Sequence, residues 1–292
     1  MPGSPAGAER QWHGEPQRLD RALAELGLAR SRSHAGELVA AGGVLVDGEP
    51  VEKAGVRVRP GAVLGVREEE RYVSRGAHKL VAALDAFGID PLGRLALDLG
   101  ASTGGFTQVL LERGAREVLA IDVGRDQLAA VLRADPRVRV VEGCNARYLD
   151  AGSLAELTGA RELPSLVVAD LSFISLTLVL PAIARCTAPG ADAALLIKPQ
   201  FEVGRVRDGV VSDPALWARA IDAVLETAAA EGFAIRGLER SPIAGGDGNR
   251  EFLVHLVHGG ASDPREWGER VRELCASAAG AVAPDSDEGS SA

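Results

Sequence analysis

The chain has 292 residues, of which 46% are hydrophobic and 25% charged. This composition excludes a disordered or fibrous protein and leaves room for more than one hydrophobic core. The net charge of −9, taken alone, argues against a nucleic-acid partner. Part of that charge lies in residues 279–292, an acidic tail rich in Gly, Ser, Pro and Ala that we expect to be disordered.

Lysine is scarce in this chain. Lys53, Lys79 and Lys198 are the only lysines among 32 basic residues, and the others are arginine. This pattern indicates a coding bias toward Arg, Ala and Gly. Because an arginine cannot release its proton at usable pH, a chain with this bias is expected to keep a lysine mainly where arginine will not serve.

The cysteines and the apolar runs narrow the class of protein further. The three cysteines are far apart and form no CxxC pair, so we expect neither a disulfide framework nor a metal site. Residues 1–17 lack the pattern of a secretion signal, and no apolar run is long enough to span a bilayer. A cytoplasmic protein without a membrane segment is therefore expected.

Two helices and a small sheet are predicted for residues 16–67. Apolar residues recur at helical spacing over residues 19–26, and Gly27 is placed to end that helix. A second helix is predicted after Ser31. Alternating valines then run into Asp47-Gly48, a strong hairpin signal.

The pattern changes to alternating strands and helices over residues 74–278, after a charged linker at residues 68–73; residues 1–15 are expected to be flexible. The sequence therefore predicts an α/β fold, a Rossmann-like, doubly wound, mostly parallel sheet preceded by a small α+β domain. The predicted strands cover residues 95–98, 118–122, 138–141, 166–170, 193–197, 235–238 and 251–257, and helices are predicted at 77–87, 128–132, 217–230 and after Asp263-Pro264.

A glycine-rich turn follows the first of these strands. Glycines let a backbone approach a ligand closely, and the N-terminus of the next helix presents unpaired N–H groups. An acid at the end of the second strand stands where such folds place a carboxylate on a ribose diol. The candidate cofactor-binding residues are Asp98, Gly100, Ala101, Ser102, Thr103, Gly104, Gly105, Phe106, Asp122 and Val123.

The spacing of the two acids also fits a dinucleotide-dependent dehydrogenase, and a glycine turn without a ligand is a further alternative. Two features favour another cofactor. The turn reads D-L-G-x-S-x-G-G rather than G-x-G-x-x-G, and it is preceded by an acid, Asp98. A carboxylate in this position fits a ligand with a positive ammonium group, such as S-adenosylmethionine.

Four charged residues are candidates for the chemistry. Asp170 and Lys198 each follow an apolar strand directly, so their side chains should meet at the carboxyl ends of the strands. Lys79 lies on a predicted helix, and Glu251 opens the last strand. We expect Lys198 to deprotonate or steer an attacking hydroxyl, with Lys79 promoting its neutral form. The two acids would orient the lysines and the hydroxyl.

The alternative interpretation is that these residues are ordinary surface charges: salt-bridged lysines, a helix cap and an exposed strand start. Other methylation chemistries are disfavoured. Enzymes that methylate base nitrogens commonly carry an Asn/Asp-Pro-Pro-aromatic turn, whereas Asp170 is followed by Leu-Ser-Phe173. Covalent methylation of a base carbon needs a cysteine nucleophile at the same edge, and we expect Cys144 and Cys186 to be small core residues instead.

Several segments together resemble a known family. Arg18-Leu-Asp, Ser31-Arg-Ser-His-Ala35 and Gly43-Val-Leu-Val-Asp-Gly48 are similar to the S4 RNA-binding domain. The rest of the chain resembles the TlyA-type ribosomal RNA methyltransferases, historically labelled hemolysins. The segments that carry this second resemblance are Ser74-Arg-Gly-Ala-His-Lys79-Leu, Leu97-Asp-Leu-Gly-Ala-Ser-Thr-Gly-Gly-Phe-Thr107, Ala169-Asp-Leu-Ser-Phe-Ile-Ser-Leu176, Ile197-Lys-Pro-Gln-Phe-Glu202 and Gly248-Asn-Arg-Glu-Phe-Leu253.

The resemblance implies an FtsJ-like methyltransferase domain that uses S-adenosylmethionine to methylate a ribose 2′-hydroxyl. Family members act on cytidines of 16S and/or 23S ribosomal RNA within ribosomal subunits. The Lys-Asp-Lys-Glu tetrad of the family falls on Lys79, Asp170, Lys198 and Glu251. The resemblance also assigns cofactor binding to residues 98–106 and Asp122.

RNA positioning is assigned by the resemblance to the S4-like module, which is only weakly basic: residues 18–66 carry seven Lys/Arg and six Asp/Glu. The competing interpretation of its arginines is solvated helix charge. Two further hypotheses for the whole protein are an inactive, ribosome-associated RNA-binding protein and a hemolysin-like secondary activity. The candidate RNA-binding residues are Arg18, Arg21, Arg30, Arg32, Lys53, Ser74 and Arg75.

Overall fold

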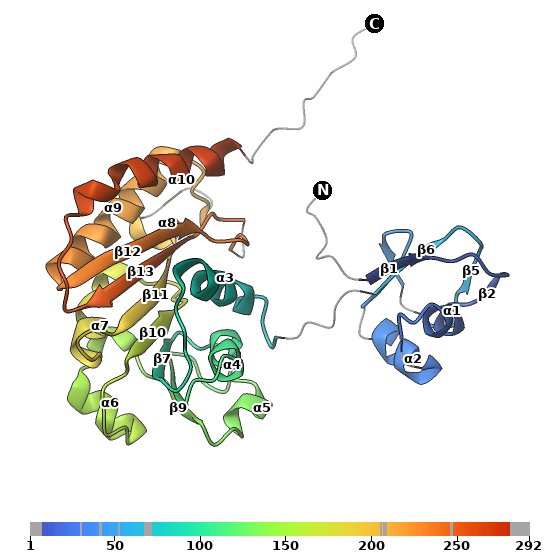
Figure 1. Ribbon diagram of the computed structural model, residues 1–292, viewed down its shortest axis with the longest axis horizontal. Coiled ribbons are helices and arrows are strands. Elements are labelled where there is room, and N and C mark those ends of the chain that lie inside the picture. The colour runs from blue at the N-terminus through green and yellow to red at the C-terminus, as the bar shows by residue number, and fades with distance from the viewer. Residues whose placement is uncertain are drawn as a thin grey trace, which may run out of the picture. The chain divides into compact units, whose positions relative to one another are not determined.

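The computed structural model describes residues 8–29, 31–40, 43–51, 53–66, 72–204, 206, 209–245 and 248–280 (Figure 1). The chain divides into two compact units, residues 1–71 and 72–292. Arg30, most of the predicted linker and the predicted tail beyond residue 280 lie outside the described residues.

Both predicted helices of the N-terminal unit are present, as α1 (Leu19–Glu25) and α2 (Arg32–Ala40). Gly27 follows α1 with a φ of 68°, a left-handed conformation that glycine adopts without a steric cost. The inner faces of the two helices pack into one core with residues of the strands. The helical side chains in that core are Leu19, Ala22, Leu23, Ala35, Leu38 and Val39.

A four-stranded sheet of order β1-β6-β3-β4 completes this core. Its hairpin turns at Asp47 and Gly48, whose φ values of 52° and 83° are those of a type I′ turn, so the predicted hairpin is confirmed. The strands of the unit are β1 (Ala8–Gln11), β3 (Val44–Val46), β4 (Glu49–Pro50) and β6 (Val63–Val66), and β2 (Gln17–Arg18) pairs separately with β5 (Arg57–Val58).

Strand β1 corrects the prediction that residues 1–15 are flexible throughout. Residues 8–11 pair antiparallel with β6, and Trp12, which follows them, is buried and donates its backbone N–H to Ala62 O at 2.8 Å. The segment Ala-Glu-Arg-Gln has no apolar alternation. Its strand conformation is held by backbone pairing with β6 and by the buried Trp12, neither of which leaves a period-two pattern in the sequence.

The C-terminal unit is built on a seven-stranded sheet of order β12-β13-β11-β10-β7-β8-β9. All neighbouring strands are parallel except at β13, which runs antiparallel to both β11 and β12. The prediction of a mostly parallel α/β sheet is confirmed. Its strands are β7 (Leu95–Leu99), β8 (Glu117–Asp122), β9 (Val138–Glu142), β10 (Leu166–Ala169), β11 (Asp192–Ile197), β12 (Phe233–Arg240) and β13 (Phe252–His258).

Helices cover both faces of this sheet (Figure 1). Side chains alternate along each strand, so that Leu97 and Leu195 face one layer of helices while Ala96 and Leu196 face the other. The second layer contains α3 (Ala77–Phe87), α4 (Gly105–Glu112) and α5 (Ala130–Arg133). The first contains α6 (Ala151–Thr158), α7 (Leu180–Cys186), α9 (Pro214–Ala230) and α10 (Gly268–Gly280).

The C-terminal helices begin differently from the prediction. Helix α9 starts at Pro214, because Asp213 Oδ1 accepts the backbone N–H of Ala215 at 2.8 Å and caps the helix there. The predicted cap Asp263-Pro264 leads first into a 3₁₀ turn, η4 (Pro264–Trp267), and α10 then continues two residues into the predicted tail.

The order of the strands creates a crevice at the carboxyl ends of the central strands, the edge of the sheet at which the parallel strands end. β7 and β10 are neighbours, although β8 and β9 come between them in the chain. At such a switch point the connections after adjacent strands diverge and leave room for a ligand at the carboxyl ends. The glycine-rich turn follows β7 and Asp170 follows β10, so both lie at this crevice.

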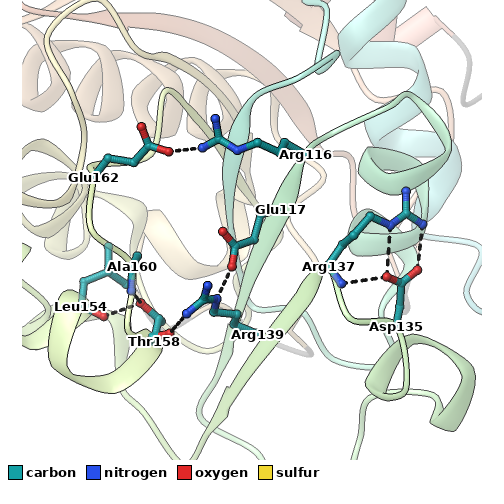
Figure 2. Close-up of polar contacts among 9 residues, drawn as sticks. All are labelled: Arg116, Glu117, Asp135, Arg137, Arg139, Leu154, Thr158, Ala160 and Glu162. Carbon is teal, nitrogen blue, oxygen red and sulfur yellow. Dashed lines mark hydrogen bonds and ion pairs between the residues drawn. The ribbon is translucent and has the colours of Figure 1, made fainter.

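Arginines at the opposite edge of the sheet are engaged by acidic residues (Figure 2). Arg139 pairs with Glu117 and donates to the carbonyl of Thr158 at 2.7 Å, where a cation is favourable because that carbonyl lies at the end of α6. Arg137 pairs with Asp135 at 2.7 Å. Since Glu117 is the first residue of β8, these contacts lie away from the crevice.

Candidate active site

The glycine-rich turn is tightly packed against neighbouring elements. Gly100 and Gly104 have φ values of 82° and 101°, which favour glycine. A Cβ atom on Gly104 would lie 2.3 Å from the side chain of Leu132. One on Gly105 would lie 3.1 Å from the backbone nitrogen of Ala77. The glycines therefore let the start of α4 approach both α5 and α3.

Asp98, in β7 just before the turn, is completely buried. Its Oδ2 accepts a hydrogen bond from Thr107 Oγ1 at 2.7 Å, whereas Oδ1 has no hydrogen-bond partner among the described residues. Burial raises the pKa of this carboxyl from 3.8 to about 7, against the opposing effect of the Thr107 bond. A buried carboxyl oxygen without a partner is the kind of group that a bound cation would satisfy.

Asp122 ends β8 and ties two loops together. Its Oδ2 accepts the backbone N–H of Ser102 at 2.7 Å, and its Oδ1 accepts that of Gly124 at 2.6 Å. Each carboxylate oxygen can accept a further hydrogen bond, so hydroxyl donors can still bind here. Val123, next to Asp122, is exposed, and both residues line a cleft at the carboxyl ends of the strands.

That cleft has a volume of about 870 Å³ and runs along the ends of β7, β8, β9 and β10. A smaller hollow of about 160 Å³ extends it toward α3, with Ser74 and Lys198 in its wall. The cleft and the smaller hollow adjoin each other, because they share four lining residues: Gly100, Ser102, Asp170 and Ser172.

The four candidate catalytic side chains form a chain of ion pairs. Lys198 Nζ lies 2.6 Å from Asp170 Oδ1, and Lys79 Nζ lies 3.4 Å from Asp170 Oδ2. Lys79 Nζ also lies 2.7 Å from Glu251 Oε2. Lys79, Lys198 and Glu251 are buried, and the side chain of Asp170 is 19% exposed. The alternative of ordinary surface lysines and an exposed strand start is therefore wrong.

Strand geometry explains why these residues meet. Alternation along β10 and β11 directs residues 170 and 198 toward the face that α3 covers, and α3 carries Lys79 in its first turn. Because β13 is antiparallel, its first residue lies at the carboxyl edge, with Phe252 opposite Ile197. Glu251, directly before β13, and Lys198, directly after β11, therefore lie at the same end of two neighbouring strands.

Other residues at this edge were not singled out from the sequence. Lys198 Nζ donates to Ser172 Oγ at 2.9 Å. Phe173 has a φ of 64°, is 93% exposed and lies with its ring centroid 5.4 Å from that of Phe201. Glu202 accepts hydrogen bonds from Ser175 and Leu176, which follow β10. All four lie inside the segments 169–176 and 197–202 that carry the family resemblance, so these motifs were the signal that could have pointed to them.

Asn249 is a further unexpected residue beside the tetrad. Its side chain is buried, accepts the backbone N–H of Val211 at 2.9 Å and donates to Gly209 O at 2.9 Å. It fixes the backbone two residues before Glu251.

Cys144 differs from its prediction as a core residue, because it is half-buried and lines the large cleft. Burial raises the pKa of its thiol, so the nucleophilic thiolate is disfavoured. Burial also raises the pKa of Cys186 to about 12. Neither thiol is suited to covalent catalysis.

The candidate RNA-binding residues fall into both units. In the N-terminal unit, Arg18 and Arg32 both pair with Asp20, at 2.9 and 3.5 Å, next to the start of α2. The hydrogen bond from Arg18 lowers the pKa of the Asp20 carboxyl. Arg21 pairs with Glu25 at 2.9 Å, and Lys53 is exposed.

Ser74 and Arg75 belong to the C-terminal unit and precede α3. Ser74 Oγ accepts the backbone N–H of Gly76 at 3.0 Å and lines the smaller hollow, while Arg75 is exposed. Within the described part of the chain, no cluster of three or more His, Cys, Asp or Glu side chains could hold a metal ion. None of the helices in the described ranges is long and apolar enough to cross a bilayer.

Comparisons with known proteins show the family to which the chain belongs. The FtsJ-like methyltransferase family matches residues 72–258, and the S4 domain matches residues 17–64. A 16S/23S rRNA (cytidine-2′-O)-methyltransferase, TlyA of Mycobacterium tuberculosis, is 51% identical over 82% of this chain and 89% of its own length. Hemolysin A of Brachyspira hyodysenteriae is 36% identical over 82% of this chain and 99% of its own.

A solved structure, described as a candidate hemolysin from Streptococcus thermophilus, is 39% identical and covers 90% of this chain and 96% of that one, with a TM-score of 0.69. Matches of this length and identity confirm the resemblance seen in the motifs. The chain belongs to the FtsJ-like methyltransferases and, among them, to the TlyA-type ribosomal RNA methyltransferases with an N-terminal S4 domain.

Proposed function

We propose that this protein transfers a methyl group from S-adenosylmethionine to the ribose 2′-hydroxyl of cytidine in 16S and/or 23S ribosomal RNA, within ribosomal subunits of the cytoplasm. The observation that carries the proposal is the buried chain Lys198–Asp170–Lys79–Glu251 beside the glycine-rich turn. The 51% identity to a relative named for this activity supports the choice of substrate.

The residues present fit S-adenosylmethionine. When bound, it supplies an electrophilic methyl group on a positively charged sulfur. Asp98, with its unpartnered oxygen, is suited to the ammonium group, and Asp122 is suited to the ribose hydroxyls. The remaining cofactor-binding residues would be Gly100 to Phe106, through their backbone, and Val123.

The protein must orient the hydroxyl and accept its proton as the new carbon–oxygen bond forms. Lys198 is better placed for this than Lys79, because it lines the smaller hollow and has one carboxylate neighbour. Lys79 is paired with two carboxylates, Asp170 and Glu251. We assign proton acceptance to Lys198 and charge balance to the other three residues.

Two features support RNA as the partner. Phe173 is an exposed aromatic ring at the cleft, and nucleic-acid bases stack on such rings. The S4 match covers residues 17–64. We propose that residues 16–67 hold the RNA through Arg18, Arg21, Arg30, Arg32 and Lys53, that Ser74 and Arg75 contact it near the site, and that residues 74–278 perform the transfer.

The test is to incubate the protein with S-adenosylmethionine and separated ribosomal subunits from cells that lack the gene, and then to map 2′-O-methyl groups. A new ribose methyl on one or both subunits is expected. If the protein binds S-adenosylmethionine and the subunits but no new ribose methyl appears, the proposal fails and a non-catalytic RNA-binding role replaces it.

A further inference from the structure

The loop of residues 170–175 carries three groups that face the site. Asp170 pairs with both lysines, Ser172 accepts a hydrogen bond from Lys198, and Phe173 stands exposed at the cleft. The loop is held in an unfavourable conformation, because Phe173 is a bulky residue with a φ of 64°. Something outside the loop must therefore hold it in place.

The segment that begins at Lys198 contacts this loop at its far end as well. Residues 199–202 form the short helix α8 (Pro199–Glu202), which places Phe201 beside Phe173 and Glu202 beside the start of η2 (Leu176–Leu178). Glu202 Oε1 accepts the backbone N–H of Leu176 at 2.8 Å. Glu202 Oε2 accepts a hydrogen bond from Ser175 Oγ at 2.5 Å.

Glu202 is unusual because its hydrogen-bond donors within the described part of the chain, Ser175 and Leu176, are neutral. Burial raises the pKa of its carboxyl, although the bonds from Ser175 and Leu176 oppose that effect. A half-buried carboxylate that is bonded by neutral donors, with no cation among the described residues to balance its charge, costs stability. Such a residue is expected where its geometry serves function more than stability.

We propose that Glu202 is a positioning residue that clamps the loop of residues 170–175, so that Ser172 and Phe173 are presented correctly to the reacting ribose. This inference rests on the proposed function. Lys198 and Glu202 lie at the two ends of one five-residue segment, so the clamp also fixes the loop relative to the proposed proton acceptor. Misplacement of reacting groups by about 1 Å can reduce a rate about 100-fold.

The test compares Glu202→Ala with Glu202→Gln, because glutamine keeps an oxygen that can accept the N–H of Leu176. We expect Glu202→Ala to lower kcat/KM on ribosomal subunits by about 10-fold to 100-fold. Glu202→Gln should keep kcat/KM within about threefold of the wild type, a difference of less than about 0.7 kcal/mol in activation free energy. Glu156→Ala, at an exposed position of α6, is the control and should change nothing.

Hydrogen exchange at the amide of Leu176 reads the clamp without any catalysis. It should accelerate at least about tenfold in Glu202→Ala and stay near the wild-type rate in Glu202→Gln. The proposal is overturned if Glu202→Ala, folded by circular dichroism, keeps wild-type kcat/KM, or if its Leu176 amide exchanges at the wild-type rate. An inactive wild type instead refutes the proposed function, while the exchange experiment still decides whether the clamp exists.

Discussion

Lys79 Nζ lies 2.7 Å from Glu251 Oε2, a buried ion pair between the helix before the first strand of the sheet and the start of the last. Replacing Glu251 by alanine leaves Lys79 with Asp170 alone, at 3.4 Å. Breaking a buried pair from one side typically costs about 3–5 kcal/mol. We expect Glu251→Ala to lower the free energy of unfolding by that order in urea titrations.

The double variant Lys79→Met/Glu251→Leu separates stability from chemistry. Removing both charges together avoids an uncompensated buried charge, so it should recover much of the stability lost in Glu251→Ala. Its methyl-transfer activity should remain negligible. If the double variant is as unstable as the single one, the ion pair is not what holds these elements together.

Lys198→Arg tests whether a proton must be released at this position. Arginine keeps the positive charge but cannot act as a base, and general base catalysis contributes about 100-fold to 10,000-fold. Single-turnover methylation at neutral pH should slow by at least about 100-fold, with the affinity for S-adenosylmethionine retained. Lys53→Arg, at an exposed lysine of the other unit, is the matched control and should be nearly silent, because arginine keeps the positive charge that we propose contacts RNA there. Full activity of Lys198→Arg would rule out a deprotonatable lysine.

Asp98→Asn should make the free protein more stable at alkaline pH. The pKa of Asp98 is about 7 in the folded protein and 3.8 in the unfolded chain, so the unfolded chain loses the proton first as the pH rises. Stability therefore falls between about pH 4 and pH 7, by roughly 4 kcal/mol in total, and the loss is complete above pH 7. The neutral asparagine escapes this loss.

The measurement is urea unfolding of both proteins at pH 4 and pH 8. The free energies of unfolding should differ more at pH 8, in favour of Asp98→Asn, and the variant should bind S-adenosylmethionine more weakly. Equal differences at the two pH values would show that the carboxyl does not titrate in this range.

Phe173→Ala should weaken the recognition of RNA and leave the stability of the fold unchanged. The ring is 93% exposed, so its removal exposes no core, and stacking of a base on an aromatic ring is worth about 1–3 kcal/mol. We expect kcat/KM on ribosomal subunits to fall about 5-fold to 150-fold, with Phe173→Trp close to the wild type. The same loss in both variants would argue against stacking.

The sequence was most informative where local patterns set the structure. Short apolar runs alternating with helical segments placed all seven strands of the large sheet, and Asp47-Gly48 located the hairpin turn. The position of Asp170 and Lys198 directly after buried strands was enough to expect them at one edge of the sheet, and they lie 2.6 Å apart. Their catalytic roles remain predictions.

Long-range pairing was harder to predict. Strand β1 has no apolar alternation from which it could be predicted. Its backbone bonds to β6 hold it in the strand conformation instead. The pairing of Lys79 with Glu251 depends on the antiparallel direction of β13, which its sequence does not encode. Glu202 looked like one acid among many, since only the fold brings Ser175 and Leu176 to it.

The chemical identity of the product tests the account most directly. Ribosomal subunits treated with the wild-type protein and with Lys198→Ala, each with isotopically labelled S-adenosylmethionine, are digested to nucleosides and analysed by mass spectrometry. The account predicts labelled 2′-O-methylcytidine with the wild type and none above background with Lys198→Ala. A label on the base rather than on the ribose, or equal labelling by both proteins, would contradict it.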